Sequence, residues 1–311
     1  MTASPYFCSL TSRLAEEACF GTGVTADIWL LVECPEAWER DAVKGSSLPS
    51  EVKAHLNSLA KASKRIRVLL IKRDPRTDPP YHIFVAFTKE KEQRIASLLV
   101  NDHRELLTLS SDGLLNDKIE IEYEEFRSPL FLVCTHGKHD KCCAKYGFAT
   151  YKLMHDADPG SVWQTSHIGG DRFASNVISF PTGVYYGHVD DAAALFIIAA
   201  EQRGDIFLEN YRGRTCYGRY SQVGEYFIRR ESGIRASDAL LRRSAKADRE
   251  KALWTVQFSS ADMRRRYIVT FEVRRSDRKA FLTCHASEER SPVEYHLIEY
   301  RELEEKASLD D

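Results

Sequence analysis

Cysteine and histidine residues gather in one stretch of the 311-residue sequence, from Leu130 to Val189. Three of the eight cysteines and five of the ten histidines lie between Cys134 and His188. Thiolate sulfur and imidazole nitrogen are ligands that zinc and iron centres prefer in proteins. The stretch therefore predicts a metal or iron–sulfur site.

The spacing inside this stretch indicates two ligand loops. Eight residues separate Cys134 from Cys143, and three residues separate His167 from Asp171. Each loop follows an apolar run that we expect to be a strand, PLFLVC for the first and SVWQTSH for the second. Because loops at the carboxyl ends of neighbouring strands converge in α/β sheets, both pairs are expected to face one site.

This donor set suits a binuclear iron–sulfur cluster. Thiolates would hold one iron, and His167, with or without Asp171, the other. A neutral imidazole in place of a thiolate raises the reduction potential of such a cluster. We expect Gly169 and Gly170 to let the backbone pass close to the bound group, since neither carries a Cβ atom.

The elements around the loops predict two α/β units. For the first unit, over residues 25–115, we expect strands at 27–34, 65–73 and 81–88, a helix at 48–63 and a second helix at 91–100. Residues 109–128 read as a linker. For the second unit we expect a strand, a helix, a strand, a hairpin around Pro181 and a helix capped by Asp190 or Asp191, which is a thioredoxin-like order.

The remainder of the chain predicts a mixed extension. We expect a helix at 222–231, a charged helix at 236–253 and an antiparallel β meander with strands at 254–260, 265–276, 279–287 and 293–303. We expect the meander to cover the N-terminal unit, because few strands of modest length stand without a second layer.

Composition limits the class of protein. Apolar residues make up 43% and charged residues 29%, which is typical of a globular protein, and the net charge of −2 gives no case for nucleic acid or an anionic membrane as partner. We find neither an apolar run near the roughly 18 residues of a membrane helix nor a secretory signal. We therefore expect a cytoplasmic protein whose cysteines are free thiols or metal ligands.

The motifs CTHGKHDKCCA, SHIGGDRFASN, the FPTGVYYG hairpin and YRGR resemble the sucrase/ferredoxin-like family of thioredoxin-like [2Fe-2S] proteins. The resemblance runs from about Cys8 to about Glu231. It implies a thioredoxin-like ferredoxin domain at 126–212, preceded by a related α/β domain at 1–125. The helical and β-meander pattern described above makes residues 213–311 a C-terminal extension. The resemblance also implies electron transfer through one [2Fe-2S] cluster, with Cys134, Cys143 and His167 as ligands.

The sequence departs from the family pattern at the fourth ligand. The family carries a second histidine where this chain has Asp171. A carboxylate is a harder, anionic ligand and should partly cancel the rise in potential. Asp171 is the expected fourth ligand. The alternatives are water, loss of the cluster, or one of four other side chains, namely Cys142, His136, His139 and His188. Cys142 and Cys143 are adjacent and should point in different directions, so both could not easily bind one iron.

Two other functions compete with electron transfer to or from a reductase or oxidase. The same residues form an acceptable tetrahedral zinc set, although zinc sites commonly use a tighter cysteine spacing. A thioredoxin-like fold also suggests thiol–disulfide exchange, but the sequence lacks the C-x-x-C motif. We expect a redox carrier more than a stand-alone enzyme.

Several residues outside the two ligand pairs are expected to be structural. Arg212 and Arg214 should lie in a solvated turn, with docking of an acidic partner as the alternative. Arg172 should pair with Asp171 or another acid. A short helix is expected from Ser12 to Cys19. The cysteines outside the motif are expected to be small structural residues: Cys8, Cys19, Cys216 and Cys284.

Overall fold

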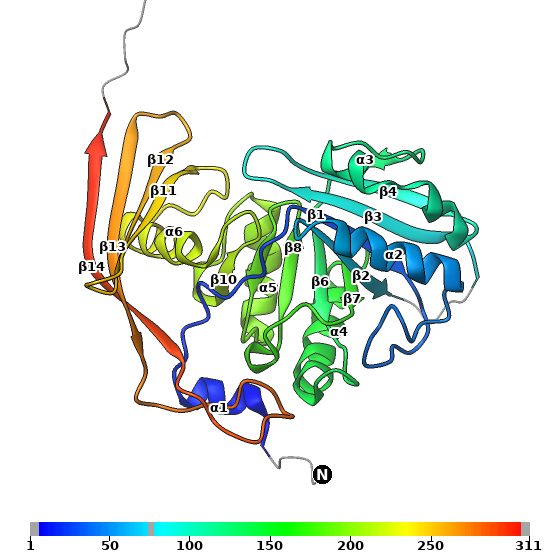
Figure 1. Cartoon of the computed structure of the whole chain (residues 1–311), viewed down its shortest axis with the longest axis horizontal. Helices are drawn as coiled ribbons and strands as arrows, with labels where there is room; N and C mark the ends of the chain where they lie inside the picture. The colour runs from blue at the N-terminus through cyan, green and yellow to red at the C-terminus, as the bar shows by residue number, and fades with distance from the viewer. Residues whose placement is uncertain (1–5, 74–77, 306–311) are drawn as a thin grey trace, which may run out of the picture.

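A ten-stranded mixed sheet forms the centre of the protein (Figure 1). The computed structural model describes residues 6–73 and 78–305. The start of the predicted domain at 1–125 and the end of the predicted extension at 213–311 therefore lie outside the described residues. The strand order is β10-β9-β8-β6-β7-β2-β1-β3-β4-β5. The mixed sheet with flanking helices confirms the predicted α/β class. Its strands are β1 (Ile28–Glu33), β2 (Ile66–Lys72), β3 (Tyr81–Thr88), β4 (Gln93–Val100), β5 (Glu124–Glu125), β6 (Leu130–Cys134), β7 (Val162–Thr165), β8 (Val177–Phe180), β9 (Val184–Tyr186) and β10 (Tyr211–Arg214).

The two halves of this sheet have the same connectivity. β1 pairs in parallel with β2 and antiparallel with β3, just as β6 pairs in parallel with β7 and antiparallel with β8. A helix joins the two parallel strands in each half, α2 (Ser50–Ala62) in the first and α4 (Phe148–Ala157) in the second. The halves meet where Ile71 of β2 lies opposite Thr165 of β7 in an antiparallel pair. The two units therefore share one continuous sheet.

The sheet curls so that the inner faces of the halves pack against each other. The Trp29 ring lies 5.5 Å from that of Phe180, and the Phe84 ring lies 5.6 Å from that of Trp163. The outer faces are covered by helices: α2 packs on the first half, while α4 and α5 (Asp191–Gln202) pack on the second. The Asp190 carboxylate accepts the Ala193 N–H at 2.9 Å, which confirms the predicted helix cap. The ligand loops thus rest on a core buried on both sides.

Two expected helices are strands. The segment 91–100 contains β4, which pairs with β3 along its whole length. The segment 236–253 contains β11 (Leu240–Asp248), which pairs with β12 (Leu253–Ser260). Both segments are rich in helix-favouring residues, but an available strand edge outweighs a propensity of a few tenths of a kcal/mol per residue. The predicted linker at 109–128 also holds short elements, α3 (Ser111–Leu115) and β5, after a 3₁₀ turn, η1 (His103–Thr108).

The expected strand at 279–287 is instead part of a long loop from residue 276 to 292. Only Ala280 makes a β-bridge there, to Arg290. The loop crosses the N-terminal helix α1 (Cys8–Leu14), as Figure 1 shows in orange and blue. The Phe281 N–H donates to Thr11 Oγ1 at 3.2 Å. Contacts with α1 have taken the segment out of the sheet, and α1 itself begins four residues before the helix expected at Ser12.

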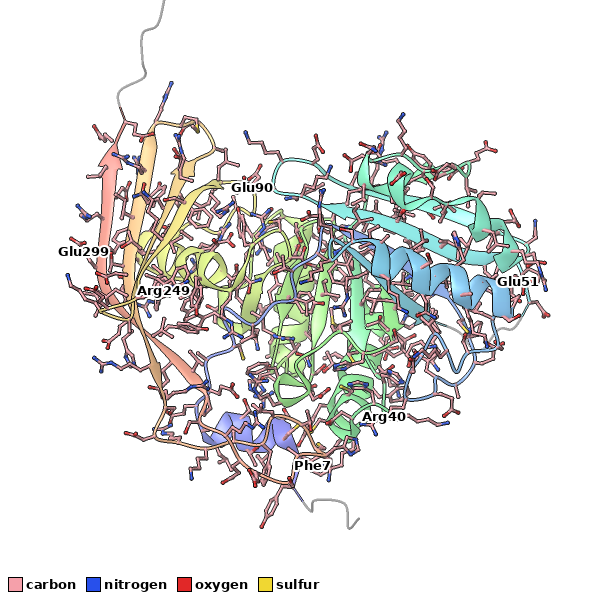
Figure 2. The ribbon with its side chains drawn as sticks, viewed as in Figure 1. Phe7, Arg40, Glu51, Glu90, Arg249 and Glu299 are labelled. Carbon is pink, nitrogen blue, oxygen red and sulfur yellow. The ribbon has the colours of Figure 1, made fainter. Side chains whose placement is uncertain are left out.

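The C-terminal strands form a second sheet in the order β11-β12-β13-β14, with β13 (Arg265–Arg275) and β14 (Val293–Glu304). Its apolar face packs on α6 (Arg219–Ser232), not on the N-terminal unit as expected. A polar contact with that unit comes from Glu90, in the turn between β3 and β4 (Figure 2). Its carboxylate accepts the Tyr217 O–H and the Arg242 N–H, both at 2.6 Å. The second sheet is therefore fixed mainly through α6.

A buried ion cluster joins α6 to β10. Glu225 Oε1 lies 2.9 Å from Arg229 Nη2 and 3.6 Å from Arg214 Nη1, and all three side chains are fully buried. The Tyr211 hydroxyl donates to the other oxygen of Glu225 at 2.5 Å. The prediction that Arg214 lies in a solvated turn is therefore wrong. A partner cannot reach it.

Glu225→Ala should unfold this junction, because it leaves two buried guanidinium groups without their carboxylate. Removing one partner of a buried ion pair costs about 3–5 kcal/mol. Chemical denaturation should show a loss of that size. Glu231→Ala, on the exposed end of the same helix, should cost less than about 1 kcal/mol. Equal losses in the two variants would contradict the assignment.

Candidate metal centre

The two predicted ligand pairs come from the ends of neighbouring parallel strands. Cys134 is the last residue of β6, and Cys143 begins a short π-helix, η2 (Cys143–Gly147). His167 follows β7 by two residues, and Asp171 begins a 3₁₀ turn, η3 (Asp171–Phe173). Because β6 and β7 are parallel and adjacent, their carboxyl ends bring both loops to one place.

The four side chains form one compact group. Nδ1 of His167 lies 3.9 Å from Cys134 Sγ and 4.0 Å from Cys143 Sγ. Oδ1 of Asp171 lies 3.3 Å from the same nitrogen and 3.9 Å from Cys143 Sγ. Both cysteines and Asp171 are buried, and His167 is partly so. The structure thus brings together every residue predicted to bind the metal, and ligation itself stays a prediction.

The four side chains shift one another's pKa values. A hydrogen bond from the Cys143 thiol lowers the pKa of Cys134 well below its usual value and raises the pKa of Cys143. Burial alone would lower the pKa of His167, but the hydrogen bond and charge of Cys134, together with Asp171, raise it. Burial raises the pKa of Asp171 to about 6, against the opposing charge of His167. Metal binding must therefore release protons here.

His139 supplies a second imidazole beside the group. Its ring stacks on the His167 ring, with centroids 3.7 Å apart and planes at 14°. Its Nε2 lies 4.0 Å from Asp171 Oδ1. His139, His167 and Asp171 thereby form a second triad of potential ligand atoms that shares two residues with the predicted set. Among the four side chains that could replace Asp171 as fourth ligand, His139 is the one at the site.

The remaining three side chains, those of His136, His188 and Cys142, are engaged elsewhere. The two nitrogens of His136 lie 2.8 Å from Glu39 O and 3.2 Å from the His167 N–H, which leaves neither free for a metal. Nε2 of His188 lies 3.3 Å from Ser12 Oγ. Cys142 packs away from Cys143, as expected for adjacent residues. His136 has instead a positioning role, because it holds the backbone of His167.

Arg212 clamps the His167 loop from behind. It is buried, and its guanidinium donates to Gly169 O at 3.1 Å, to Asn176 Oδ1 at 2.8 Å and to Thr22 O at 2.8 Å. Burial lowers its pKa to about 10. A Cβ on Gly170, whose φ is +82°, would lie 2.4 Å from Arg212 Nη2. Two predictions are wrong here. Arg212 does not lie in a solvated turn, and the space beside Gly170 holds its guanidinium and not a bound group.

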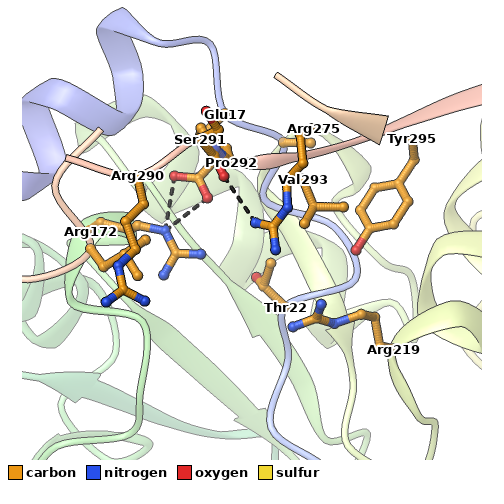
Figure 3. A pocket seen from close by; sticks show the side chains of 12 residues that line it. Glu17, Thr22, Arg172, Arg219, Arg275, Arg290, Ser291, Pro292, Val293 and Tyr295 are labelled. Carbon is orange, nitrogen blue, oxygen red and sulfur yellow. Dashed lines mark hydrogen bonds and ion pairs between the residues drawn. The ribbon is translucent and has the colours of Figure 1, made fainter. Parts of the chain in front are cut away.

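A basic cavity of about 250 Å³ lies beside Arg172, the residue that follows Asp171 in the sequence (Figure 3). Its wall includes four arginines from separate segments, Arg172, Arg219, Arg275 and Arg290. Nε of Arg172 lies 2.8 and 2.9 Å from the two carboxylate oxygens of Glu17. The acid that Arg172 pairs with is therefore Glu17 and not Asp171.

A family model covers the segment that carries this site. A family model described as sucrase/ferredoxin-like matches residues 19–213, which contain all four predicted ligands. The chain belongs to the sucrase/ferredoxin-like family. The match supports the family but specifies no cofactor.

Two fungal proteins are similar to part of the chain, and both are called altered inheritance of mitochondria protein 32. The one from Debaryomyces hansenii is 31% identical over 112 residues, 32% of this chain and 40% of that protein. The one from Meyerozyma guilliermondii is 30% identical over 107 residues, 30% of this chain and 38% of that protein. The matched segment thus covers less than half of either relative. Solved structures give no significant match. Among the described residues, no helix is both long and apolar enough to cross a bilayer.

His188 should make stability depend on pH. Burial, then the charges of Arg13 and Arg212, lower its pKa to about 3 from an ordinary value of 6.5. Between these values the unfolded chain binds a proton that the folded chain excludes, so the free energy of unfolding falls as pH drops below about 6.5. The slope from this group is about 1.4 kcal/mol per pH unit.

His188→Asn should flatten that slope by about 1 kcal/mol per pH unit between pH 6 and pH 4, in urea denaturation of the metal-free protein. Asparagine tolerates the positive φ of this position. His296→Asn, an exposed histidine on β14, serves as the matched control and should leave the slope unchanged. Parallel slopes for wild type and His188→Asn would rule out a neutral His188 in the folded protein.

Proposed function

We propose that the chain is an electron-transfer protein, more a redox carrier than a stand-alone enzyme, that holds one [2Fe-2S] cluster through Cys134, Cys143, His167 and Asp171. When bound, such a group accepts and releases single electrons. One observation carries the proposal: two buried thiols and an imidazole–carboxylate pair come together from separate loops of adjacent strands. His167 Nδ1 lies within 4.0 Å of both sulfur atoms and of the Asp171 carboxylate, which also lies 3.9 Å from Cys143 Sγ. This donor set fits the group that the family resemblance implies.

The protein's own residues give the site three properties. Burial of both thiols excludes water from the sulfur ligands. The guanidinium of Arg212, whose hydrogen bonds within the described residues all go to neutral oxygens, places a buried positive charge behind the ligand loop. That charge favours an anionic group in front of it, because an uncompensated buried charge is costly. A proton on the second ring nitrogen of His167 can couple to electron transfer.

Asp171 is the proposed fourth ligand because its carboxylate already contacts both His167 and Cys143. His139 lies farther out: its side chain is 33% exposed, against 9% for Asp171. We assign His139 to the solvent side of the site, where its ring covers His167.

Cluster content and spectra test this proposal. Protein purified without oxygen should contain equal amounts of iron and acid-labile sulfide, with visible absorption that bleaches on reduction. Asp171→His should keep the cluster and raise its potential by on the order of 100 mV, since imidazole replaces an anionic ligand. Asp171→Ala should change the electron paramagnetic resonance spectrum, while His139→Ala, beside the same ring, should not.

A colourless protein without iron or sulfide after anaerobic reconstitution would refute the cluster. An unchanged spectrum in both Asp171 variants would remove Asp171 as a ligand. A changed spectrum in His139→Ala alone would assign the fourth position to His139.

A single zinc ion is the second candidate. The donor atoms of Cys134, Cys143 and His167 all lie within 4.8 Å of one another, close enough for three ligands of one zinc ion. Zinc without acid-labile sulfide would select this candidate. Thiol exchange through Cys142 and Cys143 loses support, because these residues face different clusters.

We propose that a protein partner, a reductase or an oxidase, exchanges electrons at the His139–His167 edge. The His167 side chain is 19% exposed, so a ligand of the site reaches the surface there. The backbone of Arg40 hydrogen-bonds to His139, and Figure 2 shows Arg40 at the margin of the molecule. A further basic side chain, next to His139 in the sequence, is the exposed Lys138. This edge suits an acidic partner surface.

Lys138→Glu should slow electron transfer to an anionic acceptor at this edge. Lys138 is 53% exposed and pairs with Glu39. With ferricyanide as acceptor, oxidation of the reduced protein should slow roughly threefold at low ionic strength and approach the wild-type rate near 1 M salt. Lys152→Glu, an exposed lysine on α4, is the control for net charge. Equal slowing in both variants would place the exit elsewhere.

We propose a cytoplasmic location, which the free thiols support. All eight cysteines are free, although three sulfur atoms lie within 3.6 Å of one another. Free thiols at such distances favour a reducing compartment. The name of the fungal relatives refers to mitochondrial inheritance, and a match over less than half their length carries no location to this chain.

A further inference from the structure

A second group of ligand-type side chains lies behind the candidate centre. It contains the thiols of Cys8, Cys142 and Cys284 and the carboxylate of Asp140, all buried. The residues come from three separate parts of the chain: helix α1, the first ligand loop and the long loop at 276–292. Two of them, Cys8 and Cys284, lie outside the segment that matches the family model. The electron carrier proposed above does not use this group.

The sulfur atoms form a nearly regular triangle. Cys142 Sγ lies 3.2 Å from Cys284 Sγ and 3.6 Å from Cys8 Sγ, and the third side measures 3.5 Å. The two oxygens of Asp140 lie 3.9 and 4.0 Å from Cys8 Sγ. Sulfur atoms around one tetrahedral zinc ion lie about 3.8 Å apart, given a zinc–sulfur distance of about 2.3 Å. A disulfide requires about 2.05 Å, so these thiols are unbonded.

Backbone amides point at the group, as they do around anionic ligands. The Ser9 N–H lies 3.5 Å from Cys142 Sγ, and the Cys8 N–H lies 3.4 Å from Cys284 Sγ. The Asp140 carboxylate accepts the N–H groups of Cys142 at 2.8 Å and Cys284 at 2.7 Å. Such donors stabilise thiolate and carboxylate charge before a cation arrives.

Within the described residues, Asp140 makes no ion pair with a lysine, arginine or histidine, although it is fully buried. The surroundings are apolar, with Phe7, Tyr146 and Phe281 packed around the sulfur atoms. Buried anionic groups are paired or bind metal ions. Three thiols and a carboxylate at tetrahedral spacing are suited to bind a metal ion.

We propose that Cys8, Cys142, Cys284 and Asp140 bind one zinc ion at a structural site separate from the candidate centre. Four protein ligands complete a closed tetrahedral set, which is the hallmark of structural zinc. Binding replaces the thiol protons, which pass to solvent, and involves no oxidation or reduction. The ion fastens α1 and the loop at 276–292 to the segment that carries Cys143.

Metal content separates the two sites. Elemental analysis of protein purified from zinc-containing medium should show one zinc per chain more in the wild type than in Cys284→Ser or Cys8→Ser. Iron and acid-labile sulfide should be unchanged in these variants. Cys134→Ser should show the reverse pattern, with iron and sulfide lost and this zinc retained. Cys34→Ser changes a buried cysteine outside both groups and should lose neither.

Native mass spectrometry of the unmodified chain provides a test that needs no variant. The expected mass includes one zinc ion that leaves on treatment with a strong chelator, with all eight cysteines reduced. A mass lower by two hydrogens, with a Cys142–Cys284 or Cys8–Cys142 bridge in the peptide map, would replace the zinc site by a disulfide. Equal zinc in wild type, Cys284→Ser and Cys8→Ser would also overturn the proposal. Absence of iron alone would contradict only the electron carrier.

Discussion

The buried guanidinium of Arg212 is the interaction on which the candidate centre depends. It ties Thr22 at the start of the N-terminal unit to Gly169 and Asn176, which flank the turn that carries Asp171. A pKa of about 10 keeps it charged at neutral pH although it is buried. The fold tolerates that charge because four hydrogen bonds to neutral oxygens solvate it and the nearby Asp171 carboxylate attracts it. Fold and site are therefore coupled: the clamp positions the ligands, and Asp171 attracts the clamp.

The grouping of the four candidate ligands could be predicted from the sequence alone, because its determinants are local or follow a general rule. Cys134 and His167 each follow an apolar run by no more than two residues, and parallel neighbours in an α/β sheet present their carboxyl ends together. The caps and hairpins of the second unit are encoded by adjacent residues. For this reason the predicted order of its elements matches the structure.

The features of the fold and the site that the sequence did not predict depend on contacts between distant segments, which composition and periodicity do not encode. The strands β4 and β11 replace expected helices because partner strands offer hydrogen bonds there. Arg212 and Arg214 look like surface residues in YRGR, and only the curled sheet and α6 bury them. Cys8 and Cys284 stand 276 positions apart, so spacing could not relate them. His139 reaches the site through the path of its own loop, which contains no secondary structure to predict.

The peptide between Cys142 and Cys143 shows how one loop can serve two groups. Cys142 has helical backbone angles, φ −65° and ψ −38°, and successive helical residues project about 100° apart. One thiol therefore faces His167 and the other faces Cys284. A π-helical turn follows at Cys143. Such turns are rare in proteins overall, but many of those that occur lie at functional sites. A Cβ on Gly147 in that turn would lie 1.9 Å from Cys134 O, so the turn is pressed against the end of β6. Movement of Cys142 would displace Cys143, which gives the C-terminal extension a structural role: through Cys284 it fixes the far side of the ligand loop.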